Sequence, residues 1–167
     1  SGEPVTFDEL ADWSLRSEES IRYYSGTATY AKTIEIPEAV FKDRPPLFID
    51  LGRVEAMASV SMNGNELGIV WKRPFRIALG DAARPGKNTL LLRVVNLWPN
   101  RMIGDERLPS DSERDEYGTL KLWPQWLLEN GKSPTGRVTF ATWRHWTADS
   151  PLMPSGLLGP VTLVREE

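Results

Sequence analysis

Tryptophan is the residue whose number and neighbours point most directly to chemistry in this sequence. The chain has 167 residues and seven Trp, and five of these stand beside polar side chains in stretches without a regular strand or helix pattern. An indole ring stacks on the C–H face of a sugar, while amide, carboxylate, guanidinium and imidazole groups bind its hydroxyls. We therefore expect a carbohydrate site built from Trp98, Asn100, Arg101, Asp105, Glu106, Trp123, Trp126, Trp143, Arg144, His145 and Trp146.

The same residues also have a structural interpretation. Trp rings can close the ends of a sandwich or dock on a neighbouring domain, and polar side chains of residues 96–105 can bond to backbone groups that a sheet would otherwise satisfy. Both interpretations stay open for 96–105. The segment Trp71-Lys72-Arg73-Pro74 places cations beside an indole. This suits a carboxylated sugar, but a charged strand edge that discourages pairing is the preferred interpretation.

Glycoside hydrolysis by this chain alone has little support. It needs two carboxyl groups about 5 to 9.5 Å apart, one of them with a raised pKa. Asp105 with Glu106 is one candidate pair, but adjacent residues of an extended segment point to opposite sides. An acidic run in a loop is usually solvated, and this applies to Asp111, Glu113, Asp115 and Glu116. We predict no catalytic residue.

Other catalytic and cofactor chemistry is also disfavoured. A Ser-His-Asp hydrolase would have to use His145 with Asp149 and Ser150 or Ser155, and there is no Gly-x-Ser-x-Gly elbow. One His and no Cys rule out clustered transition-metal ligands and disulfides. We expect no cofactor and no metal, except that a structural Ca²⁺ is compatible with oxygen ligands that the sequence does not identify.

Charge and hydropathy exclude two classes of partner. The chain has 20 Lys and Arg against 23 Asp and Glu, a net charge of −3, whereas a nucleic-acid binder needs a basic face that displaces counterions. No apolar run approaches the roughly 18 residues of a spanning helix. We expect neither nucleic acid nor membrane as a partner.

The residues between these candidate site segments predict β-structure. Short β-branched or aromatic runs alternate with period two and are separated by Gly and Pro, which is typical of an antiparallel sandwich or barrel. Asn63-Gly64-Asn65 tolerates the positive φ of a tight turn and predicts a hairpin between 57–62 and 66–71. Other strands are expected at 27–36, 47–51, 75–79, 89–96, 137–142 and 161–164.

Two segments depart from this rhythm. Thr6-Phe7-Asp8-Glu9 fits a capping box, so we expect a short helix ending near Trp13, with residues 1–13 as an N-terminal helical lead-in. Residues 97–136 form a loop excursion much longer than ordinary connections, and such excursions usually serve a function or a partner contact. The whole chain, 1–167, is expected to be a single β-sandwich domain.

Several motifs together carry a family resemblance. Gly26-Thr27-Ala28-Thr29-Tyr30, Asn63-Gly64, Pro85-Gly86-Lys87-Asn88 and Ser155 to Val161 resemble the sugar-binding β-sandwich of family 2 glycoside hydrolases, a galactose-binding-domain-like jelly roll. More narrowly, the segments 21–30, 50–54, 96–105 and 150–156 resemble the C-terminal sandwich of large bacterial α-L-rhamnosidases of glycoside hydrolase family 106 and their relatives. The resemblance covers about residues 13–165.

The resemblance implies both fold and function. It implies an all-β, antiparallel jelly-roll β-sandwich that serves as a non-catalytic carbohydrate-binding or accessory domain of a bacterial glycoside hydrolase acting on plant polysaccharide. In the rhamnosidases the catalytic carboxylates lie on a separate barrel, which cannot fit in 167 residues. The implied partners are a rhamnose- or uronate-containing polysaccharide and a catalytic domain of the same polypeptide, in a secreted or periplasmic protein. The alternatives are a domain that only braces a catalytic barrel and, less favoured, a small glycosidase in its own right.

Overall fold

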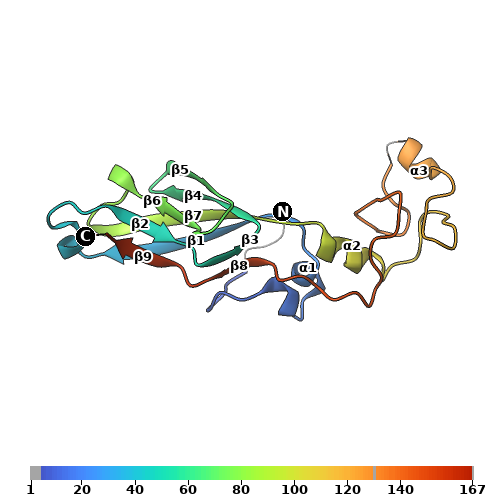
Figure 1. The fold of residues 1–167 in the computed structure, drawn as a ribbon, viewed down its shortest axis with the longest axis horizontal. Helices are drawn as coiled ribbons and strands as arrows, with labels where there is room; N and C mark the ends of the chain where they lie inside the picture. Colours follow the sequence, from blue (N-terminus) through green and yellow to red (C-terminus); the bar gives the residue numbers. More distant parts are fainter. Residues whose placement is uncertain (1–4, 130, 167) are drawn as a thin grey trace. The chain divides into compact units, whose positions relative to one another are not determined.

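The chain divides into two compact units. The computed structural model describes residues 5–129 and 131–166. The first unit, here called the sandwich unit, comprises Ser1–Asp12, Gly26–Asn96 and Ser155–Glu167, and the second, the loop unit, comprises Trp13–Ser25 and Leu97–Pro154. Every named strand lies in the sandwich unit (Figure 1).

The sandwich unit is built from antiparallel strands in three sheets. The largest sheet has the order β1 (Gly26–Ile36), β7 (Gly86–Asn96), β4 (Met57–Met62), β5 (Asn65–Val70). The second has the order β6 (Arg76–Ala78), β2 (Leu47–Asp50), β9 (Thr162–Arg165). A two-stranded sheet pairs β3 (Arg53–Glu55) with β8 (Gly156–Gly159). The predicted all-β antiparallel sandwich is confirmed.

Alternating side chains of the central strands form one apolar core. In β7 every second residue is buried, and Leu90, Leu92 and Val94 point into the cluster. Val60 of β4 and Ile49 of β2 belong to the same cluster, so the four-stranded and three-stranded sheets bury their facing sides together. This is the period-two pattern of a sheet with one face on a core.

The predicted hairpin is confirmed, and its turn is anchored from outside. Asn63 has a φ of 52° and Gly64 a φ of 84°. The Asn63 side chain donates to the carbonyl of Ala82 and to Oδ1 of Asn88, both at 2.8 Å, and accepts from the backbone nitrogen of Thr89 at 2.9 Å. The turn therefore also connects β4 and β5 to the start of β7.

The helix predicted from Thr6 to Trp13 is wrong. Residues 1–4 of the predicted lead-in lie outside the described residues, and residues 5–12 contain no helix. The ring of Phe7 instead lies 6.4 Å from that of Tyr30 in β1. A helix of this length is marginal by itself, so apolar contact with the strands decides the conformation. Short helices begin only later, with η1 (Trp13–Leu15) and α1 (Glu19–Arg22).

The long segment after β7 has little regular structure. Its helices are α2 (Pro99–Asp105) and α3 (Gln125–Leu128), and single antiparallel bridges join Arg114 to Leu120 and Thr119 to Trp143. The strand predicted at 137–142 is wrong, so the irregular region extends to 154 rather than 136. The remaining 3-10 helices, η2 (Glu38–Phe41) and η3 (Gly80–Ala82), lie in the sandwich unit. No helix in the described ranges has the length and hydropathy needed to span a membrane.

Candidate functional site

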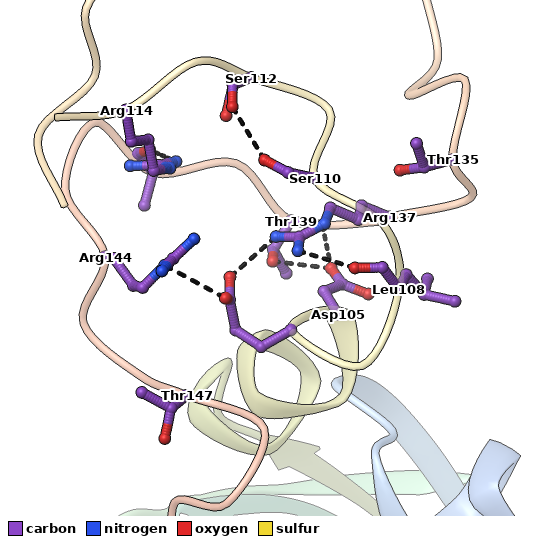
Figure 2. Close-up of polar contacts among 12 residues, drawn as sticks. Asp105, Leu108, Ser110, Ser112, Arg114, Thr135, Arg137, Thr139, Arg144 and Thr147 are labelled. Carbon is purple, nitrogen blue, oxygen red and sulfur yellow. Dashed lines mark hydrogen bonds and ion pairs between the residues drawn. The ribbon is translucent and has the colours of Figure 1, made fainter. Parts of the chain in front are cut away.

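A small pocket in the loop unit gathers charged side chains that are far apart in the sequence. Arg114, Arg137 and Arg144 line it together with the carboxylates of Glu106 and Asp111. Figure 2 shows the side chains of Arg137 and Arg144, which belong to the same segment, extending toward one another, and Arg114 on a different segment. Since these residues come from an irregular region, side-chain bonds must hold the walls in place.

Glu106 connects two of the arginines. Its Oε1 lies 2.8 Å from Nη1 of Arg137, and its Oε2 lies 3.3 Å from Nε of Arg144. Arg137 also donates from Nε to the carbonyl of Pro109 at 2.9 Å and from Nη2 to that of Leu108 at 3.0 Å. Only 9% of the Arg137 side chain is exposed. All three of its side-chain nitrogens have partners, and these bonds hold the residues that follow α2 against the segment that contains Arg137.

Arg114 fastens another part of the wall and lies in a repulsive environment. It donates from Nη1 to the carbonyl of Gly118 at 3.0 Å and from Nη2 to that of Ala141 at 2.6 Å. Burial lowers the pKa of Arg114, and the charges of Arg144 and Arg137 lower it further, while the two pocket carboxylates act in the opposite direction. An added negative charge in the pocket would relieve this repulsion.

Aromatic rings complete the pocket. Trp143, His145, Trp146 and Phe140 are among its lining residues. Trp143 donates from Nε1 to the carbonyl of Tyr117 at 2.9 Å, and its ring meets that of His145 edge to face at 4.9 Å. The indole is held in position, yet 49% of Trp143 is exposed. Such a ring can stack on a ligand without first being ordered.

The structure brings part of the predicted site together. Of the predicted residues, Glu106, Trp143, Arg144, His145 and Trp146 line the pocket. The other six predicted residues lie elsewhere in the loop unit, and contacts within that unit account for most of them.

Asp105 organises the backbone of the loop unit. It is 1% exposed. Its Oδ2 accepts from the backbone nitrogens of Val138 and Thr139 at 2.9 and 2.7 Å and from Oγ1 of Thr139 at 2.8 Å. Its Oδ1 accepts from Nη2 of Arg101 at 2.7 Å. Both oxygens are therefore occupied, and Asp105 with Arg101 serves the loop rather than a sugar hydroxyl.

Asn100 pairs with a distant backbone segment. This buried side chain accepts from the backbone nitrogen of Met153 at 2.8 Å and donates to its carbonyl at 2.7 Å. The amide reproduces the hydrogen-bond pattern of a neighbouring strand. Of the two interpretations left open for residues 96–105, the backbone-bonding one describes both Asn100 and Asp105.

The remaining predicted Trp residues separate into two places. Trp123 and Trp126 both lie with ring centroids 5.9 Å from Phe140, and Trp126 donates from Nε1 to the carbonyl of Asp111 at 3.0 Å. Trp98 is largely exposed and immediately precedes α2. It is not among the lining residues of the pocket.

Several pocket residues were missed by sequence reasoning. Arg114 and Asp111 lie inside the charged run 111–116, whose acidic residues the sequence predicts to be solvated. The residues next to Arg137 in the sequence do not mark it as a pocket residue, because its side-chain partners are about thirty residues away. Within residues 5–129 and 131–166 there is no group of three or more His, Asp or Glu side chains that could hold a metal ion.

Comparison with known proteins relates the chain to parts of larger glycosidases. No protein-family model matches it. A Formosa agariphila protein named "Putative beta-glucuronidase" is 46% identical over 159 residues, which cover 95% of this chain and 14% of that protein. The structure of a rhamnosidase from Novosphingobium sp. PP1Y matches with a TM-score of 0.70 and 33% identity over 94% of this chain and 12% of that one. The chain thus spans only about an eighth of either relative.

Proposed function

We propose that this chain is a non-catalytic, carbohydrate-binding accessory domain of a larger bacterial glycoside hydrolase. The observation that carries the proposal is the pocket in which Trp143 and Trp146 lie beside Arg144, His145 and Glu106. A half-exposed indole next to charged hydrogen-bonding groups is the combination that sugar recognition requires. Both relatives, by their names, are glycosidases.

The proposal extends to the parent protein and its setting. We assign the chain to the galactose-binding-domain-like sandwiches found in family 106 α-L-rhamnosidases and their relatives, with a catalytic domain of the same polypeptide as partner. The ligand is a rhamnose- or uronate-containing plant polysaccharide, and the protein is secreted or periplasmic. No cofactor is part of the proposal, and a structural Ca²⁺ is compatible with it only through oxygen ligands that are not assigned. The support is the similarity of nearly the whole chain to a small share of each glycosidase.

The carboxylates of the loop unit support a non-catalytic role. Glycoside hydrolysis needs one carboxyl group that stays protonated and a second that is free to act. Both carboxylate oxygens of Glu106 are held in ion pairs, Oε1 by Arg137 and Oε2 by Arg144. Its neighbour Asp105 has both oxygens bound within the protein. Neither is placed to act as a general acid.

A second candidate function is that the chain braces a catalytic domain. Eight large apolar side chains among the described residues of the loop unit are more than half exposed, and such surface often marks a protein contact. They are Leu15, Leu97, Trp98, Tyr117, Leu122, Trp123, Leu128 and Val138. If the bracing role were the only one, these residues would be protected in the parent protein and no sugar would bind the isolated chain.

Calorimetric titration of the chain with L-rhamnose, D-galacturonate and pectic oligosaccharides tests the proposal. We expect binding by at least one of them at millimolar concentration. Absence of binding by all three would contradict the carbohydrate-binding role and leave bracing as the better account. Incubation with aryl rhamnosides should give no turnover, and turnover that disappears in Glu106→Gln would contradict the non-catalytic role.

A further inference from the structure

We infer that the pocket selects a carboxylated sugar, a uronic acid unit, whose carboxylate binds the terminal nitrogens of Arg144. This inference rests on the proposed carbohydrate-binding function and names the ligand class of the same site. It follows from the balance of charge in the pocket, the hydrogen bonds that its arginines already make, and the position of one indole.

The pocket has an excess of positive charge. Three guanidinium groups, those of Arg114, Arg137 and Arg144, face two carboxylates, those of Glu106 and Asp111. The lowered pKa of Arg114 includes repulsion from both other arginines. A ligand with one negative charge would balance the set, whereas a neutral sugar would leave the repulsion in place.

The three arginines differ in how many of their side-chain nitrogens already have a hydrogen-bond or ion-pair partner. Arg137 uses Nε and both terminal nitrogens on Glu106, Pro109 and Leu108. Arg114 uses both terminal nitrogens on backbone carbonyls. Arg144 makes its contact with Glu106 through Nε, and in the described part of the chain neither of its terminal nitrogens has a partner.

Arg144 is therefore the group that can receive an anion. Its side chain is 44% exposed, so a ligand can approach it. The Glu106 contact on Nε orients the guanidinium and leaves its terminal edge open. This edge carries two parallel donors that match the two oxygens of a carboxylate, an arrangement that gives short, strong and direction-specific hydrogen bonds.

Two further observations favour a sugar acid over a simple anion. Trp143 adjoins Arg144 in sequence and in the pocket wall, and its half-exposed ring offers a stacking surface for a pyranose face. Oδ2 of Asp111, another lining residue, is buried and has no hydrogen-bond partner. A ligand hydroxyl is the kind of donor that would satisfy it. A uronate supplies carboxylate, apolar face and hydroxyls in one ring.

The test compares matched acidic and neutral sugars on the same chain. Methyl glucuronide and methyl galacturonide are titrated against methyl glucoside and methyl galactoside, with acetate as a bare carboxylate. We expect the uronides to bind about tenfold more tightly than the neutral sugars and than acetate, as one charge-assisted bidentate contact provides. Arg144→Gln should abolish this difference, so that the uronides and the neutral sugars then bind with equal affinity.

Controls make the outcome specific. Arg107→Gln removes an exposed arginine of the same unit, 3.8 Å from Glu19 and outside the pocket lining, and should retain the preference. Arg144→Lys keeps the charge but not the two-donor edge and should retain only part of it. Circular dichroism identifies any variant that does not fold.

The failures of the two proposals are distinguishable. Binding of neutral and acidic sugars with equal affinity, or an unchanged preference in Arg144→Gln, would overturn the uronate assignment while the carbohydrate-binding function stands. Acetate binding as tightly as the uronides would also overturn it, because the site would then recognise only an anion. Absence of binding by every sugar would overturn the proposed function and this inference together.

Discussion

Asp105 and Thr139 are bonded twice, because one carboxylate oxygen of Asp105 lies 2.7 Å from the backbone nitrogen of Thr139 and 2.8 Å from its hydroxyl (Figure 2). The same oxygen also accepts the backbone N–H of Val138. A single side chain at the end of α2 thus does for this stretch what a neighbouring strand does in a sheet. The pocket residues that follow, from Phe140 onward, depend on this attachment.

Replacement of Asp105 should loosen the loop unit. Asp105→Ala leaves two backbone N–H groups and Arg101 without their acceptor, and we expect the free energy of unfolding of this unit to fall by about 3 kcal/mol. Amide hydrogen exchange at Val138 and Thr139 should accelerate accordingly. Asp149→Ala, an exposed position in the same unit, should change stability by less than about 0.5 kcal/mol. Equal exchange rates in both variants would contradict the role of Asp105.

Asn100 should matter for folding and not for ligand binding. Asn100→Ala removes both bonds to Met153 at a buried site, and we expect a loss of about 2 kcal/mol in urea denaturation. Below the unfolding transition, the sugar affinity should equal that of the unchanged chain. Gln125→Ala, which removes an exposed side chain of α3, serves as the control. A weakened sugar affinity in folded Asn100→Ala would show that Asn100 contacts the ligand.

Two tryptophans should respond differently to truncation. Trp143→Ala should weaken sugar binding by about 1 to 3 kcal/mol, since it removes the exposed indole of the pocket. Trp98→Ala should leave the titration unchanged, because Trp98 is not part of the lining. Calorimetry on both variants, with folding checked by circular dichroism, measures the difference. The reverse order of effects would place the sugar near α2 instead.

Alanine substitution at two glycines distinguishes the cost of backbone strain from the cost of steric overlap. Gly52 and Gly64 have φ values of 63° and 84°, so alanine at either position costs about 1 to 2 kcal/mol of backbone strain. At Gly52 a Cβ would come within 2.5 Å of the carbonyl carbon and oxygen of Gly159, whereas at Gly64 nothing lies within 4 Å. We expect Gly52→Ala to lose about 2 kcal/mol more than Gly64→Ala in thermal unfolding. Equal losses would mean that β3 and β8 move apart easily.

The sandwich could be predicted because its signals are local. Asn63-Gly64 favours a tight turn because both residues tolerate a positive φ. The alternation of Leu90, Leu92 and Val94 identifies the face that β7 buries. The N-terminal helix failed for the opposite reason. The capping-box pattern at Thr6 is also local, but contact of Phe7 with Tyr30 outweighs the weak preference of a short helix.

The loop unit could be predicted only in part, because its bonds join distant residues. Val138 and Thr139 have the composition of a strand, yet their N–H groups bond to a carboxylate more than thirty residues earlier. Asn100 binds Met153 across fifty-three positions. The pair Trp143 and Arg144 could be recognised from adjacency alone, whereas Arg114 and Arg137 became visible as pocket residues only in three dimensions.

The way in which Asp105 and Asn100 hold the loop unit has an evolutionary consequence. In a β-ladder, backbone pairing restricts the conformation of every residue along the strand. In the loop unit a few polar side chains hold the backbone instead, so the residues between them need not pair with a neighbouring strand. Substitutions at exposed positions between these anchors can then accumulate without dismantling the scaffold. Descendants of this chain can in that way change the exposed surface of the loop unit while retaining the same anchors.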